Sequence, residues 1–405
     1  MTASRVIEIA PAAPPRLART AVRVDSIDIV RGAVMALMAL DHVRVFSGVP
    51  AGGPTAAVFL TRWVTHFCAP AFFFLAGTSA FLRGGGRTGG PSLSRWLVTR
   101  GLVLVALELT VIRLSWTFNF DYAHYVLAGV IWMLGWCMVL LAVMLVLPTR
   151  VIGIIGVLII VSHNALDYYQ GDPSTWPAAW FWQILYWGGP VKFGDGHLLA
   201  VLYSIIPWVG VMAAGFWFGE VMTWEPARRR TFCLRLGFGA IALFFVLRLI
   251  DGYGDPNHWK VAQEWNKTTP TFLRFLATNK YPASLVFLLM TLGPMFVAIP
   301  LLEHARSRVA GWLATIGRVP LFFYLLHIPL IHLSAVIVSY IRTPDLTPWL
   351  FLNHPMEAGK APDGFMWPLW LLYLDTAIVV TILYFPCRWF AHLKDTRRDV
   401  WLSFL

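Results

Sequence analysis

Ionisable side chains recur inside the first hydrophobic segment of the chain, which reads VDSIDIVRGAVMALMALDHVR over residues 24–44. Asp28, Arg31 and His42, together with two methionines between them, recur at helical spacing and form one stripe of a helix. A guanidinium suits phosphate or carboxylate groups, and an imidazole exchanges protons near neutral pH. Because a charge at a bilayer centre costs roughly 2.5–3.5 kcal/mol on insertion scales, this stripe indicates a functional site.

The stripe would separate two kinds of chemistry along the helix axis. At 1.5 Å per residue, His42 lies about 21 Å beyond Asp28, so the Asp28–Arg31 pair belongs near one surface and His42 in the opposite half. The pair is compatible with a simple ion pair and with a guanidinium held for a phosphate. His42 is either a hydrogen-bonded structural histidine or a reactive one. Asp41 points about 100° away from His42, and Gly32 would let another helix or a ligand approach.

More polar side chains fall in the later hydrophobic segments. Arg62 and His66 share a helix face in TRWVTHFCAP, and both are predicted to lie in the same half as His42. Ionisable residues in a membrane usually face the interior of the bundle. The other candidates are Glu108, Arg113, His163, Asp167, Arg318, Tyr324, His327 and His332. No H-E-x-x-H, Walker or G-x-S-x-G pattern occurs, so we predict no metal and no nucleotide-triphosphate site.

The elements that carry these residues are long and apolar. The 405 residues are 58% hydrophobic and 13% charged, whereas a soluble domain carries about 25% charged residues. The apolar runs have about the 20 residues that cross a bilayer, which predicts an all-α polytopic membrane protein of about 10 transmembrane helices. The expected spans are 28–48, 56–82, 96–117, 124–147, 150–166, 198–222, 231–250, 282–303, 311–340 and 367–389. The aromatic stretch 176–189 would be an eleventh, interfacial element.

Basic residues predict the orientation and the domain limits. The short connections rich in Arg alternate with longer loops of mixed charge, which places the N- and C-termini in the cytoplasm of a multi-pass inner-membrane protein. We expect a disordered cytoplasmic tail over 1–22, a membrane domain over 23–392 and a cytoplasmic tail over 393–405. The net charge of +11 therefore needs no nucleic-acid partner, and the four cysteines show neither a metal-site nor a disulfide pattern.

Two motifs stand out in the outer loops. YGDPNHW brings Asp255 together with Tyr253 and Trp259, and NKYPAS places Lys280 at a membrane boundary before a helix. Lys280 is either a side chain that snorkels to the interface or a group that binds a ligand.

Several motifs together resemble one family. They are VDSIDIVRGAVMALMALDHVR, WVTHFCAPAFFFLAGTS, HNALD, YSIIPWVGVMAAGFWFG, KYPASLVFLLMTLGP and IGRVPLFFYLLHIPLIH. The set is similar to the bacterial relatives of heparan-α-glucosaminide N-acetyltransferase, a group with many domains of unknown function, over nearly the whole chain. The resemblance implies a multi-pass acyltransferase that moves an acetyl or similar group from cytosolic acyl-CoA to a sugar across the membrane. Broader integral-membrane acyltransferases that modify envelope polysaccharides carry an Arg and a His at the spacing of Arg31 and His42. The lysosomal enzyme, however, has its reactive His in the first loop, and the corresponding VFSGVPAGGPT has none.

The resulting hypothesis is a transmembrane acyltransferase-like domain with acyl-CoA as co-substrate, no metal and an envelope carbohydrate as acceptor. His42, His66 and Asp41 are the predicted catalytic residues, and Arg31 with Asp28 would hold the phosphates of CoA. The imidazole would act as general base or transient acyl acceptor. The supporting or substrate-binding residues would be Arg62, Glu108, Arg113, His163, Asp167, Asp255, Lys280 and His327. A proton-coupled transporter and a non-catalytic membrane scaffold remain alternatives, and a homodimer is possible.

Overall fold

The structure is a computed structural model. It describes residues 25–53, 55–85, 90–168, 178–194, 196–261 and 269–397, and in addition residues 399 and 402. The predicted tail over 1–22 lies outside these described residues.

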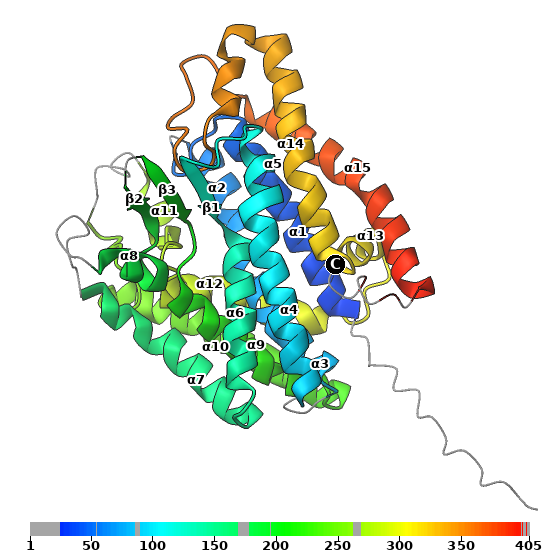
Figure 1. Cartoon of the computed structure of the whole chain (residues 1–405). Coiled ribbons are helices and arrows are strands. Elements are labelled where there is room, and N and C mark those ends of the chain that lie inside the picture. The colour runs from blue at the N-terminus through cyan, green and yellow to red at the C-terminus, as the bar shows by residue number, and fades with distance from the viewer. Residues whose placement is uncertain are drawn as a thin grey trace, which may run out of the picture.

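Helices make up most of the fold (Figure 1). The first half of the chain contains α1 (Asp25–Phe46), α2 (Ala56–Trp63), η1 (Val64–Phe67), α3 (Cys68–Arg83), α4 (Pro91–Leu107), η2 (Glu108–Ile112), α5 (Arg113–Thr117), α6 (Val130–Met144), α7 (Thr149–Ser162), η3 (His163–Tyr168), α8 (Ala179–Trp182) and η4 (Gln183–Trp187). The second half contains α9 (Ile205–Met222), α10 (Pro226–Ile250), α11 (Thr271–Leu276), α12 (Leu285–Leu301), α13 (Arg308–Gly317), α14 (Pro320–Arg342), η6 (Pro344–Phe351) and α15 (Leu369–Thr396).

Six helical segments in the described part of the chain are long and apolar enough to cross a membrane. They are Ala56–Arg83, Thr149–Tyr168, Ile205–Met222, Pro226–Ile250, Pro320–Arg342 and Leu369–Thr396. Two shorter apolar helices, Val130–Met144 and Leu285–Leu301, accompany them. The helical membrane class is therefore supported. Each predicted span overlaps a helix, but the number of spans and the orientation stay predictions.

A small sheet departs from the all-α prediction. β1 (Tyr125–Ala128) pairs in parallel with β3 (His197–Val201), and β3 pairs antiparallel with β2 (Gly189–Phe193), in the order β1-β3-β2. The spans predicted from 124 and from 198 were therefore wrong at their first residues. Short apolar runs such as YVLA and HLLAV look alike in a strand and at a helix end, because periodicity needs a longer window.

Two further boundaries differ from the prediction. The span predicted over 311–340 is two helices, α13 and α14, which meet at Val319 in a non-helical conformation (φ −131°, ψ 52°). The ring of Pro320 disfavours helical geometry in the preceding residue, which explains the break. In the aromatic stretch 176–189, whose first two residues lie outside the described chain, α8 and η4 lead into β2.

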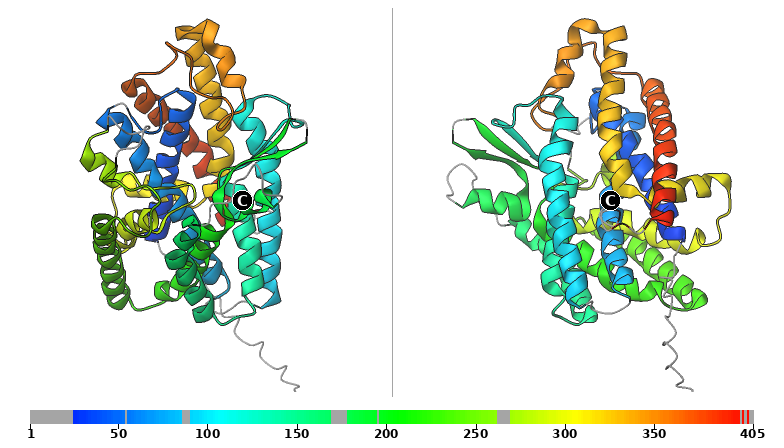
Figure 2. Two further views of the ribbon diagram at one scale, coloured as in Figure 1. Left: turned by 90° about the vertical axis from the view of Figure 1, so that its left-hand side faces the viewer. Right: turned by 45° about the vertical axis from the view of Figure 1, so that its right-hand side comes forward.

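Helix α1 runs through the interior of the bundle, where it contacts α3, α12, α13, α14 and α15. Figure 2 (right) shows it in blue between α14 and α15. Its closest neighbour is α13: a Cβ on Gly32 would lie 1.9 Å from the carbonyl oxygen of Leu313, and one on Gly317 would lie 1.8 Å from that of Asp28. Gly32 therefore admits another helix, which was one of the two options that the sequence left open.

Candidate functional site

The central feature of the site is a pair of histidines on α1 and α14. His42 Nδ1 lies 2.7 Å from His327 Nε2, and His327 Nδ1 lies 2.6 Å from the carbonyl oxygen of Tyr324. A carbonyl oxygen only accepts, so His327 Nδ1 carries a hydrogen and donates it. With both rings neutral, His327 Nε2 then accepts from His42 Nδ1–H. This leaves His42 Nε2 without a proton and able to accept one.

The surroundings of His42 hold its ring but do not close it off completely. Trp116 contacts the ring edge-on with centroids 4.8 Å apart, and the His327 ring stacks with its centroid at 4.9 Å. His327 is fully buried, whereas His42 is partly exposed. The geometry therefore fits a reactive imidazole that a buried partner orients.

Asp41 pairs with two arginines rather than with His42. Its two carboxylate oxygens accept from Arg44 Nε at 3.1 Å and from Arg62 Nη1 at 3.0 Å. This bridge joins α1 to α2 and holds both guanidinium groups. Within the described residues, no hydrogen bond joins Asp41 to the His42 ring, as expected for adjacent side chains that diverge on a helix.

His66, the second predicted catalytic residue, lies in η1 near the same cluster. Its ring meets Phe287 edge-on with centroids 5.5 Å apart. Its Nδ1 is buried and has no hydrogen-bond partner in the described part of the chain. The charges of Arg62, Lys280 and Asp41 act on both His66 and His42. The structure thus brings the two histidines into one electrostatic environment without a hydrogen bond between them.

A pocket of about 230 Å³ opens toward the other end of α1. Cationic side chains belong to its lining, among them Arg31, Arg100, Arg318 and Lys394. The other residues that line it are Met35, Phe72, Ala76, Ser79, Trp96, Leu104, Val130, Ile131, Leu134, Met138, Pro320, Leu321 and Tyr324. The pocket thus combines positive charge with apolar walls. It reaches Tyr324, whose carbonyl oxygen holds His327, but His42 and His66 do not line it.

Arg31 is held at this pocket by several groups. Its Nη1 lies 3.2 Å from Asp28 Oδ1, and its Nη2 donates to the hydroxyl of Ser79 and lies 3.4 Å from the carbonyl oxygen of Leu75. The ion pair and a fixed, pocket-facing guanidinium therefore coexist. Sequence reasoning did not select Ser79, Trp96 or Arg100 for this site. The spacing of Trp96 and Arg100 by four residues on one helix was the available signal.

Lys280 and Tyr281 lie at the His42 end, in a loop that is held from two sides. The HNALD motif supplies the first: His163 Nε2 lies 2.7 Å from the carbonyl oxygen of Ala283, and Asn164 Oδ1 accepts from Leu285 N at 2.8 Å. Asp167 in turn accepts from the Asn164 amide and from the hydroxyl of Tyr186. His163 and Asp167 therefore position this loop.

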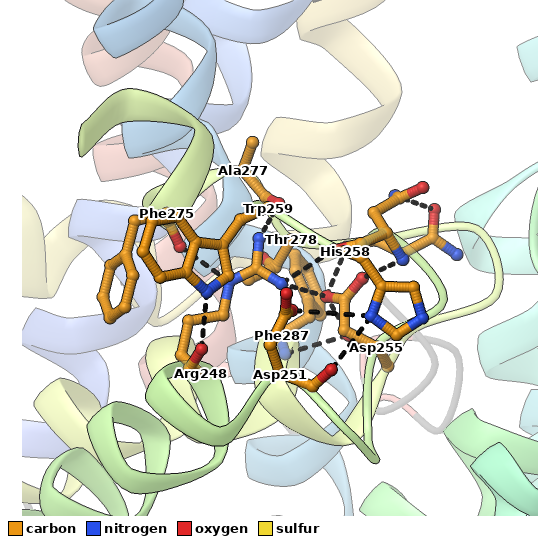
Figure 3. Close-up of polar contacts among 12 residues, drawn as sticks. Arg248, Asp251, Asp255, His258, Trp259, Phe275, Ala277, Thr278 and Phe287 are labelled. Atoms are coloured by element: carbon orange, nitrogen blue, oxygen red, sulfur yellow. Dashed lines mark hydrogen bonds and ion pairs between the residues drawn. The ribbon is translucent and has the colours of Figure 1, made fainter. Parts of the chain in front are cut away.

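Asp255 holds the same loop from the second side (Figure 3). Its carboxylate accepts from Asn257 N at 2.8 Å, Asn279 N at 3.0 Å and Ser284 Oγ at 3.0 Å. Arg248 lies 4.0 Å from Asp255 and donates to four backbone carbonyl oxygens, including that of Ala277 at 2.7 Å. Burial raises the pKa of Asp255, and Arg248 and the loop amides oppose that effect. Contact of Asp255 with a substrate stays a prediction.

Within the described residues, Glu108 and Arg113 do not form an ion pair with each other. Glu108 Oε2 accepts from Ile131 N at 2.9 Å and Trp132 N at 3.3 Å at the start of α6, where a carboxylate favours the helix dipole. Arg113 donates to backbone carbonyl oxygens of the following loop, including that of Tyr125 at 3.0 Å. Glu108 therefore fixes the start of α6, whose Ile131 lines the pocket, and Arg113 fixes the backbone that leads into β1.

Within the described residues, no group of three or more His, Cys, Asp or Glu side chains is arranged to hold a metal ion. The histidine pair supplies ring nitrogens that can exchange a proton at this site.

Comparison with known proteins gives one match. The model of the family described as "Heparan-alpha-glucosaminide N-acetyltransferase, catalytic" matches residues 23–247. The matched residues include Arg31, His42 and His66, and they end within α10, before Lys280 and His327. No curated protein matches the chain significantly.

Proposed function

Because the chain belongs to the heparan-alpha-glucosaminide N-acetyltransferase catalytic family, we propose that it transfers an acyl group from acyl-CoA to a carbohydrate acceptor across the membrane. The donor would bind at the Arg31 end, which the positive-inside bias assigns to the cytoplasm. The acceptor, a sugar of the cell envelope, would bind at the His42 end. The observation that carries this proposal is the cationic, apolar-walled pocket that extends from Arg31 to Tyr324, the residue whose carbonyl group orients the histidine pair.

The donor would use the two parts of this pocket differently. The phosphates of CoA suit the cations at its mouth, because guanidinium groups bind phosphate oxygens in a planar fork. The acyl-pantetheine arm suits the apolar walls, which include Met35, Leu104 and Met138. The arm would have to pass Tyr324 to reach His42, so this side chain stands between the donor pocket and the chemistry.

His42 would act as the general base. Its Nε2 takes a proton from the acceptor hydroxyl or amine, and the acceptor atom attacks the thioester carbonyl carbon. The carbon–sulfur bond then breaks, and the leaving thiolate of CoA takes the proton from His42. His327 keeps the reactive nitrogen unprotonated by accepting the hydrogen on His42 Nδ1. Direct attack by His42 Nε2 on the thioester, with an acyl-imidazole intermediate, uses the same tautomer. Arg62 and His66 are candidates for stabilising the oxyanion.

The test is acyl transfer by the purified full chain with [¹⁴C]acetyl-CoA and a panel of amino sugars and neutral sugars. We expect His42→Ala to lower the transfer rate by roughly 10²- to 10⁴-fold, the range of general-base catalysis, while CoA binding is retained. His392→Ala, which alters an exposed histidine on α15, is the matched control and should keep the native rate.

Native transfer rates in both His42→Ala and His66→Ala would contradict this mechanism. Proton flux driven by a substrate, without release of CoA, would instead support the proton-coupled carrier. Comparison of acetylated envelope extracts from a deletion strain and its parent identifies the acceptor.

A further inference from the structure

Lys280 is a mostly buried cation that forms no ion pair within 4 Å in the described part of the chain. Only 7% of its surface is exposed, and its ammonium group donates no hydrogen bond to another described residue. Its contacts are with aromatic rings: the ammonium nitrogen lies 5.1 Å from the ring centre of Tyr281 and 5.7 Å from that of Tyr203. Contacts with aromatic rings compensate only part of the cost of removing a cation from water. The arrangement favours a ligand that supplies negative charge.

Two arginines, Arg44 and Arg62, share the surroundings of Asp41 and His42 with Lys280. Its charge acts on Asp41 and His42, and Tyr281 interacts with the guanidinium of Arg62 through its hydroxyl. Asp41 already pairs with Arg44 and Arg62, and Lys280 acts on it from beyond ion-pair distance. Three cations thus face one carboxylate beside His42, which leaves a local excess of positive charge.

The loop that carries Lys280 is fixed in place. Asn279 N and Ser284 Oγ donate to Asp255, and His163 with Asn164 holds the residues that follow. A preorganised cation binds an anion without the cost of ordering a flexible side chain and loop. The YGDPNHW, NKYPAS and HNALD motifs therefore together fix the position of Lys280 and Tyr281.

We propose that Lys280, Arg62 and the hydroxyl of Tyr281 form an oxyanion-binding site at the His42 end, which takes a carboxylate or phosphate group of the acceptor. The assignment of this anion to the acceptor rests on the proposed function. The site would place an acidic sugar with its hydroxyl or amine beside His42. It selects acidic over neutral sugars, because a neutral sugar leaves Lys280 unpaired.

The experiment measures binding to the purified full chain by isothermal titration with glucuronate, glucose 6-phosphate, inorganic phosphate and glucose. Charge-assisted hydrogen bonds contribute enough to predict roughly 10- to 100-fold tighter binding of the acidic sugars than of glucose. Lys280→Met should abolish this preference, and Lys280→Arg should retain most of it. Lys260→Met removes a positive charge from an exposed outer-loop residue and should leave the affinities unchanged.

Equal affinities for glucuronate and glucose, or an unchanged preference in Lys280→Met, would overturn the oxyanion site. Tighter binding of inorganic phosphate than of both acidic sugars would overturn its assignment to the acceptor. CoA binding, measured on the same variants, shows that Lys280→Met is folded. Release of CoA from acetyl-CoA is measured separately. An absence of transfer would contradict the proposed function, whereas the preference for acidic sugars tests the oxyanion site by itself.

Discussion

At the scale of single residues, the group that orients the His42 ring is His327 rather than a carboxylate. In many hydrolytic sites an acidic side chain orients the catalytic histidine. Here the neighbouring Asp41 is occupied by Arg44 and Arg62, and a second imidazole lies 2.7 Å from His42. The backbone carbonyl of Tyr324 sets the tautomer of this second ring and, through it, that of His42.

The first prediction concerns this relay. His327→Leu should lower kcat for acyl transfer by roughly 10- to 100-fold, a part of the 10²- to 10⁴-fold effect of general-base catalysis, because His42 Nδ1 loses its acceptor. His327→Gln keeps an acceptor oxygen and should recover much of the rate. Both variants should bind CoA normally and are compared by full pH–rate profiles.

The interpretation of His327 as a positioning residue depends on that difference. Equal losses in His327→Leu and His327→Gln, with an unchanged pH profile, would assign His327 a packing role only.

At the scale of elements, the backbones of α1 and α13 come very close together beside the pocket that Arg31 lines. The backbones approach at Gly32 and Gly317, one residue after Arg31 and one residue before Arg318. Both arginines line the donor pocket, so the spacing of these two helices sets the position of its cations.

The second prediction tests this contact. Gly32→Val should lower the free energy of unfolding by roughly 1–3 kcal/mol, because its side chain meets the backbone of Leu313 and the helices must separate. Thermal unfolding in detergent measures the effect. Gly311→Ala on α13, where an added Cβ meets nothing within 4 Å, should be neutral or stabilising by roughly 0.5–1 kcal/mol. Equal stability of Gly32→Val and the native chain would contradict the close packing.

The connection between α14 and α15 covers the His42 end of the bundle. His354 in this connection is buried, its Nε2 donates to the carbonyl oxygen of Trp349, and its own carbonyl oxygen accepts from the Tyr125 hydroxyl. Its ring also contacts Phe46 at the end of α1. Burial lowers the pKa of His354 to about 4.

The third prediction follows from the sign of this shift. An unfolded His354 takes up a proton near pH 6.5, before the folded one does, so its contribution to stability is present above pH 6.5 and is lost as the pH falls toward 4. Hydrogen–deuterium exchange of residues 344–368 should therefore increase over this range. His354→Gln should reduce the pH dependence, and an unchanged pH response in this variant would exclude His354 as its origin.

At the scale of the whole molecule, the two ends of the bundle differ in the elements that cover them. The Arg31 end carries the pocket that Arg31, Arg100, Arg318 and Lys394 line. The His42 end carries the sheet and the α14–α15 connection, which lie in the same half of the molecule in Figure 1. The proposed transfer, from a donor on one side to an acceptor on the other, requires this separation.

The fourth prediction tests the orientation. All four native cysteines are buried, so single cysteines introduced at exposed sites report their own accessibility. A membrane-impermeant maleimide should label Lys260→Cys in intact spheroplasts and Arg306→Cys only after lysis, because both side chains are exposed and the positive-inside bias puts them on opposite sides. The reverse pattern would invert the topology and the proposed direction of transfer.

Much of the plan of the protein follows from local patterns. Apolar runs of bilayer length predicted the helical membrane class, helical spacing predicted the stripe from Asp28 to His42, and the combined motifs predicted the family. These properties depend on residues close together in the chain. The same local view misplaced the residues that form β1 and β3, because strand pairing joins segments far apart in sequence.

The sequence by itself therefore determined that this is a helical membrane protein of an acetyltransferase family, with Arg31 and His42 on one helix. Only the tertiary structure decided which side chains those two residues meet. His327 is 285 residues from His42, and the pocket of Arg31 is reached by Arg100 from α4, by Arg318 from the junction of α13 and α14, and by Lys394 from α15. The physical reason is that hydrogen bonds and ion pairs act over a few ångströms in space, whereas spacing in the sequence constrains only neighbours on the same element.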